Sequence, residues 1–239
     1  MLLGQTPPDI ILSHGGIVRG DTSTPEIHLV FTGHEFNEGG KLIRKVLKKH
    51  DSPAHFFFTG DFYRDPANKK LIRRLKRDGH YLGAHSDKHL LYATWEDRDS
   101  LLIDQATFTT DLANNYSEMA KFGISKTAAP YFMPPYEWYN KRISQWTEAY
   151  DLTLVNFTQG TRSNADYTWP ESGSRYVDSG TIYDSILAYE QNSPHGLNGF
   201  ILLLHLGTDP RRTDKFYYRL DVLLTDLEQR GYTFTLMQF

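Results

Sequence analysis

The sequence predicts an α/β protein with a mainly parallel sheet, either closed as a barrel or open and doubly wound. Short apolar runs with β-forming residues alternate with longer segments in which apolar residues recur every three or four positions. No repeat or low-complexity linker interrupts this alternation. At 239 residues and 39% hydrophobic content, the chain can bury one barrel-sized core. We expect a barrel domain at 26–239 and an N-terminal extension at 1–25 packed on it.

Seven short apolar runs, most rich in aromatic or branched residues, are the candidate strands. In chain order they are Ile27 to Phe31, His55 to Thr59, Tyr81 to Ala84, Ala129 to Met133, Leu152 to Phe157, Phe200 to His205 and Tyr232 to Met237.

The segments between these runs have helical periodicity, and several end near glycine. They are Lys41 to Lys49, Asn68 to Asp78, Phe108 to Phe122, Lys141 to Tyr150, Ile182 to Glu190 and Lys215 to Gln229. Right-handed crossovers bring the loops that follow parallel strands to one edge of the sheet. We therefore expect functional residues at the carboxyl ends of the strands.

Composition and charge exclude several classes of function. The chain has no cysteine, so any metal must be held by His, Asp or Glu. Its 26 basic and 29 acidic residues are interspersed, which argues against a nucleic-acid partner. The longest apolar runs, such as Phe200 to Leu204, are far below the roughly 20 residues of a membrane helix. We expect no transmembrane segment.

Polar residues follow almost every candidate strand. The loops that meet at the expected rim contain His34 and Glu35, Gly60 and Asp61, His85 to His89, Pro134 to Trp138, Gln159 to Tyr167, and His205 to Asp209. Any one of them can be a solvated connection. Six such loops at one edge predict a site.

His85 and His89 form the sharpest local signal. If the chain turns helically after the third strand, residues four apart share a face about 5–6 Å apart at Cβ and can reach one divalent ion. Histidine pairs also occur on solvated surfaces, so the spacing alone is weak. Its context is more specific: Gly79 to His89 resembles the second motif of the polysaccharide deacetylase family, the NodB-type family-four carbohydrate esterases.

Other segments extend this resemblance from Ile27 to the C-terminus. Ala54 to Gly60 is similar to the second strand of the family, Phe132 to Tyr136 to its third motif, and Ile201 to His205 to its fifth. The resemblance implies an α/β fold, an incomplete seven-stranded (β/α) barrel of the NodB type. It also implies an acetylated polysaccharide or oligosaccharide as partner. We expect an extracytoplasmic location, periplasmic or secreted, with the leader absent from this sequence.

Two departures from the family pattern affect its catalytic residues. Family enzymes carry Phe-Asp-Asp-Gly at the end of the first strand, with the first Asp as general base and the second as a metal ligand, whereas this chain has Phe31-Thr32-Gly33-His34-Glu35. The third-motif Arg that orients the base is Met133 here. Either the site is rebuilt with other residues or catalysis has been lost.

We favour a rebuilt site. His34, His85 and His89 are the candidate ligands of one divalent ion, zinc in the first place and cobalt or nickel as alternatives. Glu35 is then the candidate base. The roles of His34 and Glu35 can also be exchanged, and both residues can instead be solvated loop residues.

The resemblance makes His205 the general acid that protonates the leaving group. Asp61, Asp166 and Asp209 are rim carboxylates that can orient it or replace a ligand. The candidate substrate-binding residues are Tyr136, Trp138, Asp166 and Arg162, and the rim aromatics Tyr139, Tyr167 and Trp169 are placed to stack on sugars.

The function predicted first is a metal-dependent hydrolase that removes acetyl groups from an N- or O-acetylated polysaccharide. The alternative is a catalytically impaired, glycan-binding module that keeps the barrel and the aromatic rim. A metal-dependent hydrolase of another amide ranks below both, because one fold serves several substrate classes.

Overall fold

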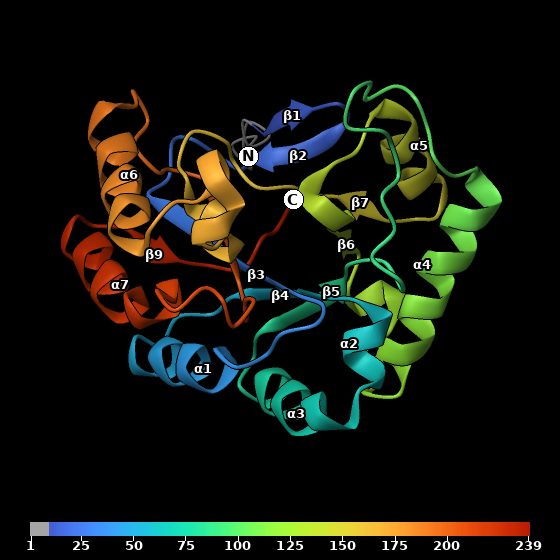
Figure 1. The fold of residues 1–239 in the computed structure, drawn as a ribbon, viewed down its shortest axis with the longest axis horizontal. Helices are drawn as coiled ribbons and strands as arrows, with labels where there is room; N and C mark the ends of the chain where they lie inside the picture. Colours follow the sequence, from blue (N-terminus) through green and yellow to red (C-terminus); the bar gives the residue numbers. More distant parts are fainter. Residues whose placement is uncertain (1–9) are drawn as a thin grey trace, which may run out of the picture.

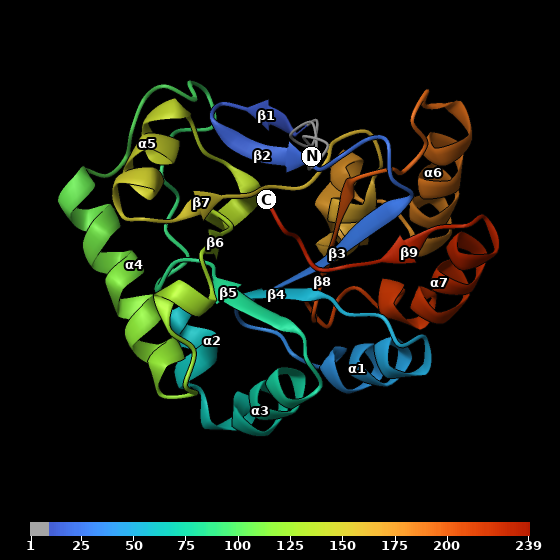
Figure 2. The same ribbon diagram turned by 180° about the vertical axis from the view of Figure 1, so that it is seen from behind.

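The computed structural model describes residues 10–239 and shows a mixed sheet curled into an incomplete barrel, with helices around its outside (Figures 1 and 2). The strands are β1 (Ile11–Ser13), β2 (Gly16–Arg19), β3 (Glu26–Gly33), β4 (His55–Phe58), β5 (Tyr81–Ala84), β6 (Tyr131–Phe132), β7 (Thr153–Leu154), β8 (Phe200–His205) and β9 (Thr233–Phe234). Their order is β1-β2-β8-β3-β4-β5-β6-β7, with β9 beside β3. Strands β3 to β9 pair in parallel, which confirms the predicted fold class.

All seven predicted strands are present as β3 to β9, but β6, β7 and β9 are only two residues long. Strand β6 lies between Pro130 and Pro134, which have no backbone N–H to continue the ladder. The hairpin β1–β2 was not predicted. Its strand β2 pairs antiparallel with β8 through Arg19 and Phe200. Ile17, also in β2, forms a bridge with Val155, which follows β7. The hairpin thus lies between the two ends of the barrel sheet.

The hairpin belongs to the expected N-terminal extension, of which residues 1–9 lie outside the described residues. His14 and Gly15 turn it, with φ of 47° and 85°. Both values are in the left-handed region, where glycine is readily accepted. The turn depends on backbone conformation rather than on an apolar run, which is why the strand pattern did not indicate it.

Within residues 10–239, seven α-helices connect the strands. They are α1 (Gly40–Lys49), α2 (Gly60–Arg64), α3 (Lys69–Arg77), α4 (Gln105–Ala120), α5 (Lys141–Ala149), α6 (Ser179–Asn192) and α7 (Leu220–Gln229). Six correspond to predicted helices. The short helix α2 replaces the loop expected after β4, because the Thr59 hydroxyl accepts a hydrogen bond from the Phe62 amide and caps it.

The apolar core has two parts. A smaller cluster fills the inside of the barrel with residues that include Val30, Phe57, Met133 and Leu203. A larger cluster lies between the outside of the sheet and the helices. The barrel is therefore filled with side chains, and polar residues can gather only where the strands end.

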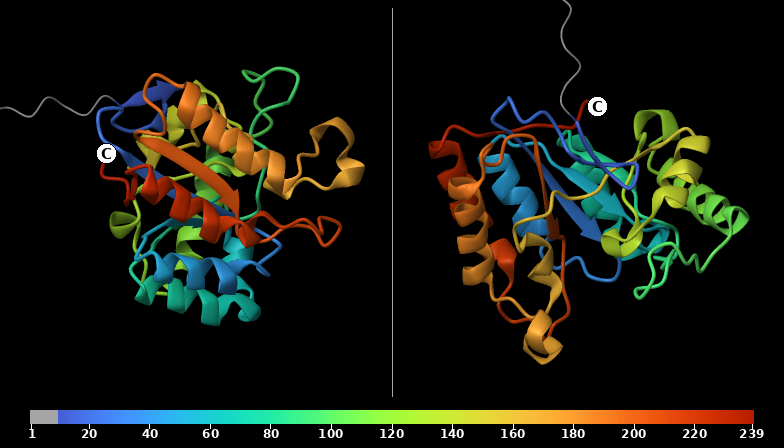
Figure 3. Two further views of the ribbon diagram at one scale, coloured as in Figure 1. Left: turned by 90° about the vertical axis from the view of Figure 1, so that its left-hand side faces the viewer. Right: turned by 90° about the horizontal axis from the view of Figure 1, so that it is seen from above.

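Three loops project from the end of the molecule at which the parallel strands finish. They are residues 88–104 after β5, 159–178 after β7 and 206–215 after β8 (Figure 3). Of the residues singled out above, these loops contain His89, Arg162 and Asp166. Within residues 10–239, no helix combines the length and the apolar character needed to cross a membrane.

Candidate active site

His34, His85 and His89 lie together at this end of the barrel. The ring centroids of His34 and His89 are 4.7 Å apart, and those of His85 and His89 are 5.1 Å apart. The expected helical turn between His85 and His89 is wrong. The chain has no helix there, and Ser86 and His89 have left-handed φ values of 71° and 55°. Such strained positions are frequent at functional sites.

Hydrogen bonds fix two of these rings. His85 Nδ1 lies 2.8 Å from the carbonyl oxygen of Met133 and donates to it, which leaves Nε2 with a free lone pair. His34 Nδ1 lies 3.1 Å from the Thr59 hydroxyl. Burial lowers the pKa of His85 to about 3 and that of His89 to about 2. Both imidazoles are therefore neutral at pH 7.

Helix α4 holds the loop that carries the histidines. The Asn115 side-chain oxygen accepts from the His85 amide at 2.9 Å. The Asp111 carboxylate accepts from the amides of Asp87 and Lys88 at 2.9 and 3.0 Å. Three backbone donors of an irregular loop are thus satisfied by side chains of one helix. This anchoring explains how the loop keeps its left-handed residues.

The donor chemistry of the three histidines fits a divalent metal ion, because neutral imidazoles are preferred zinc ligands. The arrangement is not yet that of a metal site: among the described residues no group of three or more His, Asp or Glu has ligand geometry. The rings of His34 and His89 are stacked, with an interplanar angle of 7°.

His205, at the end of β8, is paired with Asp166. The Asp166 carboxylate accepts from His205 Nδ1 at 2.5 Å and from the His205 amide at 2.9 Å. Burial alone lowers the pKa of His205, but the charge and hydrogen bond of Asp166 and the charge of Glu137 outweigh it and raise the pKa. The side chain of Asp166 is buried, and its hydrogen-bond partner is His205. Asp61 instead pairs with Lys88 and Arg64, and Asp209 with Arg211.

Glu137 is a site residue that the sequence analysis did not select. It follows β6 and is half-buried, and its charge acts on His205. Burial raises the pKa of its carboxyl group to about 7, with the nearby Asp166 adding to the rise and His205 opposing it. The signal available in the sequence was a lone glutamate beside Tyr136 in a rim loop, which is a common feature of exposed loops.

Glu35 is exposed and lines a cavity of about 440 Å³ together with Asn37, Thr208 and Lys215. No hydrogen bond or ion pair joins its carboxylate to the histidines within residues 10–239. Two residues before Glu35, Gly33 is packed tightly, since a Cβ there would approach the Phe58 ring to 2.9 Å. An aspartate at Gly33 would displace that ring.

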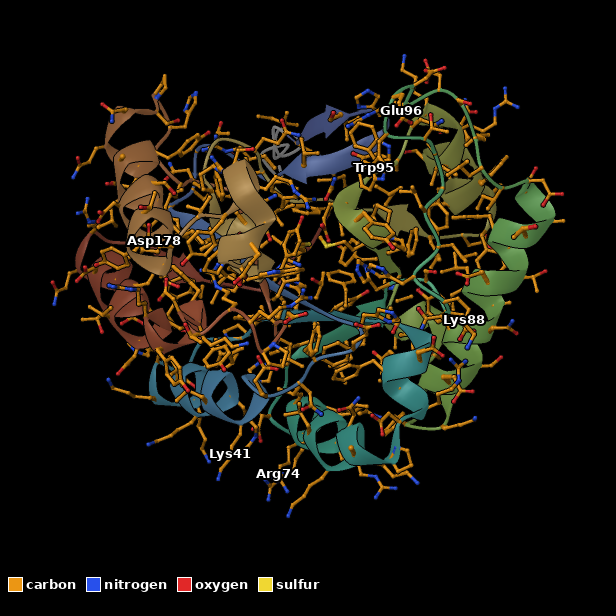
Figure 4. All side chains as sticks on the ribbon, viewed as in Figure 1. Lys41, Arg74, Lys88, Trp95, Glu96 and Asp178 are labelled. Carbon is orange, nitrogen blue, oxygen red and sulfur yellow. The ribbon has the colours of Figure 1, made fainter. Side chains whose placement is uncertain are left out.

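Aromatic side chains extend outward from the histidines. Tyr136 packs on His89 with centroids 4.4 Å apart, and Trp95 lies 5.7 Å from Tyr136 and 5.4 Å from Trp138. Trp95 and Tyr136 are 54% and 45% exposed, which leaves ring surface available to a ligand. Trp95 comes from the loop after β5, which also carries Lys88 (Figure 4). The sequence analysis did not single out Trp95.

The other rim candidates divide between the core and the surface. Tyr139 is buried and donates to the Ser13 carbonyl at 2.7 Å, so its expected place on the rim is wrong. Tyr167 is 42% exposed and packs 5.1 Å from the ring of His205. Arg162 is exposed on the loop after β7.

These features define an α/β barrel protein with a centre of histidines and carboxylates at the carboxyl ends of its strands. A sequence model of the polysaccharide deacetylase family matches residues 19–155, more than half of the chain. The protein therefore belongs to the polysaccharide deacetylase family, which confirms the resemblance found in Gly79 to His89.

Characterised relatives agree with this assignment. The peptidoglycan N-acetylmuramic acid deacetylase PdaA of Bacillus subtilis is 29% identical over 242 residues, which cover 97% of this chain and 80% of PdaA. The PdaA crystal structure, described as a family 4 carbohydrate esterase, superposes with a TM-score of 0.71 at 24% identity over 93% of this chain and 83% of that one.

A family 4 pseudoenzyme from Bacillus anthracis is equally similar in fold. Its TM-score is 0.70 at 18% identity, over 93% of this chain and 67% of the pseudoenzyme. A mutant of that pseudoenzyme is described as having restored enzymatic activity. The fold thus occurs in both active and inactive members.

Proposed function

We propose that the protein is a metal-dependent hydrolase that removes acetyl groups from an N- or O-acetylated polysaccharide. One observation carries the proposal: the His205–Asp166 pair and the three histidines lie at the same end of the barrel, although both family aspartates are absent. A non-catalytic barrel would have no need for a histidine oriented by a buried carboxylate.

His34, His85 and His89 would hold the metal, with zinc as the first choice and cobalt or nickel as alternatives. A bound divalent ion supplies Lewis-acid polarisation of the acetyl carbonyl and lowers the pKa of water to about 7. The carbonyl of Met133 supports this role by holding the His85 ring with Nε2 free.

His205 acts as general acid. Because its pKa is raised, the imidazolium form persists closer to neutral pH and can donate its proton to the leaving amine or alcohol as the bond to the acetyl carbon breaks. Asp166 fixes the tautomer by accepting from Nδ1, which leaves Nε2–H as the proton donor.

The aromatic row of Tyr136, Trp95 and Trp138 would bind the sugar chain by stacking, and Arg162, exposed on the loop after β7, would contact it. The family and the peptidoglycan-directed relative support an acetylated glycan as substrate and an extracytoplasmic place of action. The sequence analysis named Glu35 as the candidate base, and the structure adds Glu137 as a second candidate carboxylate.

A glycan-binding module without catalysis is the competing function. Thr32 and Met133 in place of the family Asp and Arg favour it, as does the inactive neighbour of the same fold. The two functions differ in what they require of His205, because stacking on a sugar needs the aromatic row and no proton donor.

The experiment compares the parent, His205→Ala and the double variant His85→Ala with His89→Ala. We expect acetate release by the parent with added metal and a loss of about 10²–10⁴-fold in His205→Ala, with zinc affinity retained. The double variant should lose zinc binding in calorimetry. Equal zinc binding by parent and double variant would show that the metal site is misplaced.

A further inference from the structure

Glu137 lies on a loop that contacts two of the three histidines. The Met133 carbonyl, at the start of this loop, accepts from His85 Nδ1, and the ring of Tyr136 packs on His89. Glu137 is the next residue after Tyr136. Its side chain therefore begins beside the histidine cluster.

The other side of the site faces the same carboxyl group. The charge of Glu137 acts on His205 at the end of β8 and on Tyr167 of the loop after β7, and the charge of Asp166 acts on Glu137. These three residues come from across the barrel end. The carboxyl group of Glu137 is thus near His205 and Asp166, and its backbone adjoins the residues that contact the histidine cluster.

The backbone of Glu137 is held in a costly conformation. Tyr136 and Glu137 have consecutive left-handed φ values of 58° and 53°, which non-glycine residues rarely adopt. Two hydrogen bonds fix this turn: the Glu137 amide donates to the Pro134 carbonyl at 3.1 Å, and the Asn156 side chain donates to the Glu137 carbonyl at 2.9 Å. These bonds fix the backbone from which the Glu137 side chain extends.

The carboxylate itself is left without a partner. No hydrogen bond or ion pair to it is found within residues 10–239, although the residue is half-buried. Its oxygens are not fully buried, so water can reach the carboxylate. A free carboxylate whose pKa lies near the working pH suits proton transfer.

We propose that Glu137 is the general base of the deacetylation, in place of the family aspartate that is Thr32 here. The inference rests on the proposed function. Water bonds to the acetyl carbon as the Glu137 carboxylate takes one of its protons. The bond from that carbon to the amine nitrogen or alcohol oxygen then breaks, and His205 gives its proton to the leaving atom. Acetate and the free amine or hydroxyl result, and the proton on Glu137 passes to solvent.

The test measures acetate release and zinc affinity in Glu137→Gln, Glu137→Asp and Glu35→Gln, with Glu148→Gln, exposed on α5 and outside the site, as the control for lost charge. We expect Glu137→Gln to lower kcat by about 10²–10⁴-fold, with zinc affinity and KM within about threefold of the parent. Glu137→Asp should keep part of the activity and the acidic limb of the pH profile. In a further variant, Glu137→Ala, added formate should partly restore acetate release.

Three results would overturn the inference. Full turnover by Glu137→Gln, with turnover lost in Glu35→Gln, assigns the base to Glu35 while the proposed function stands. Loss of zinc binding in Glu137→Gln makes Glu137 a ligand. A parent without deacetylase activity on any acetylated glycan, with zinc bound, overturns both the proposed function and this role.

Discussion

At the scale of single residues, burial and charge give each titratable group of the site a separate task. His85 and His89 are kept neutral by burial, whereas His205 has its pKa raised because Asp166 and Glu137 outweigh burial. Histidines at one end of the barrel thus divide into candidate ligands and a candidate acid. These different pKa shifts depend on burial and on neighbouring charges, which come together only when the chain folds.

The Asp166 carboxylate should determine the pH at which the rate falls on the alkaline side of the pH–rate profile. A raised pKa keeps His205 protonated to higher pH, and the acid is lost as pH rises through that pKa. Asp166→Asn removes the charge, so the pKa of His205 should fall and this decline in rate should move to lower pH. At pH 8 we expect kcat to drop about 10²-fold. A pH–rate profile checks this, with exposed Asp184→Asn as the matched control.

Glu137 should reduce stability at alkaline pH. Its folded pKa of about 7 exceeds the ordinary 4.5, so the folded state binds the proton more tightly and loses stability as pH rises from about 4.5 through 7. Glu137→Gln should therefore raise the free energy of unfolding by about 1–3 kcal/mol at pH 8 and leave it nearly unchanged at pH 4. Urea unfolding at both pH values measures this; an equal effect at both would contradict the raised pKa.

At the scale of elements, the site is assembled from loops held by side chains of other segments, such as Asp111 of α4 and Asn156 after β7. The residue types and spacing of His85 and His89 predicted a pair, but a helical turn was the wrong local structure because Ser86 and His89 are left-handed. Glu137 was missed for a related reason. Consecutive left-handed non-glycine residues at Tyr136 and Glu137 leave no mark in composition or periodicity.

Asp111 of α4 should act as a positioning residue for the histidine loop. Removing its two acceptors in Asp111→Ala leaves the amides of Asp87 and Lys88 without partners, which should cost about 1–3 kcal/mol of stability. Zinc affinity should fall about 10–100-fold, as for lost supports of metal ligands. Asp111→Asn keeps one acceptor and should lose less. Calorimetry decides, and unchanged zinc affinity in Asp111→Ala would contradict the positioning role.

At the scale of the whole molecule, most of the barrel could be predicted because its strands are apolar runs separated by amphipathic helices. The runs of β5 and β8 were predicted with their observed limits, whereas β6 is shortened between prolines. The hairpin β1–β2 could not be predicted, since its pairing with β8 and with Val155 is long-range in sequence. His34 was grouped with His85 and His89 because it follows the first predicted strand, close to the aspartate positions of the family, and the structure brings the rings of His34 and His89 to 4.7 Å.

The division at residue 25 predicted from sequence can be tested through Arg19. This buried side chain donates to the carbonyl oxygens of Asn198 at 2.8 Å and Gly196 at 2.9 Å, and to the Tyr189 hydroxyl at 3.1 Å. If the hairpin unfolds together with the barrel, Arg19→Ala should lower the free energy of the single urea transition by about 2–4 kcal/mol. A separate, early transition confined to the hairpin would show that the extension is an independent unit.

The central claim is that a rebuilt site still removes acetyl groups. Acetate release from a panel of N- and O-acetylated glycans, measured on metal-free protein and after addition of zinc, cobalt or nickel, tests it most directly. The account predicts release from at least one glycan that requires added metal and is abolished by chelation. Binding of a glycan at the aromatic rim, with no acetate released under any metal, would contradict the account and leave a glycan-binding module.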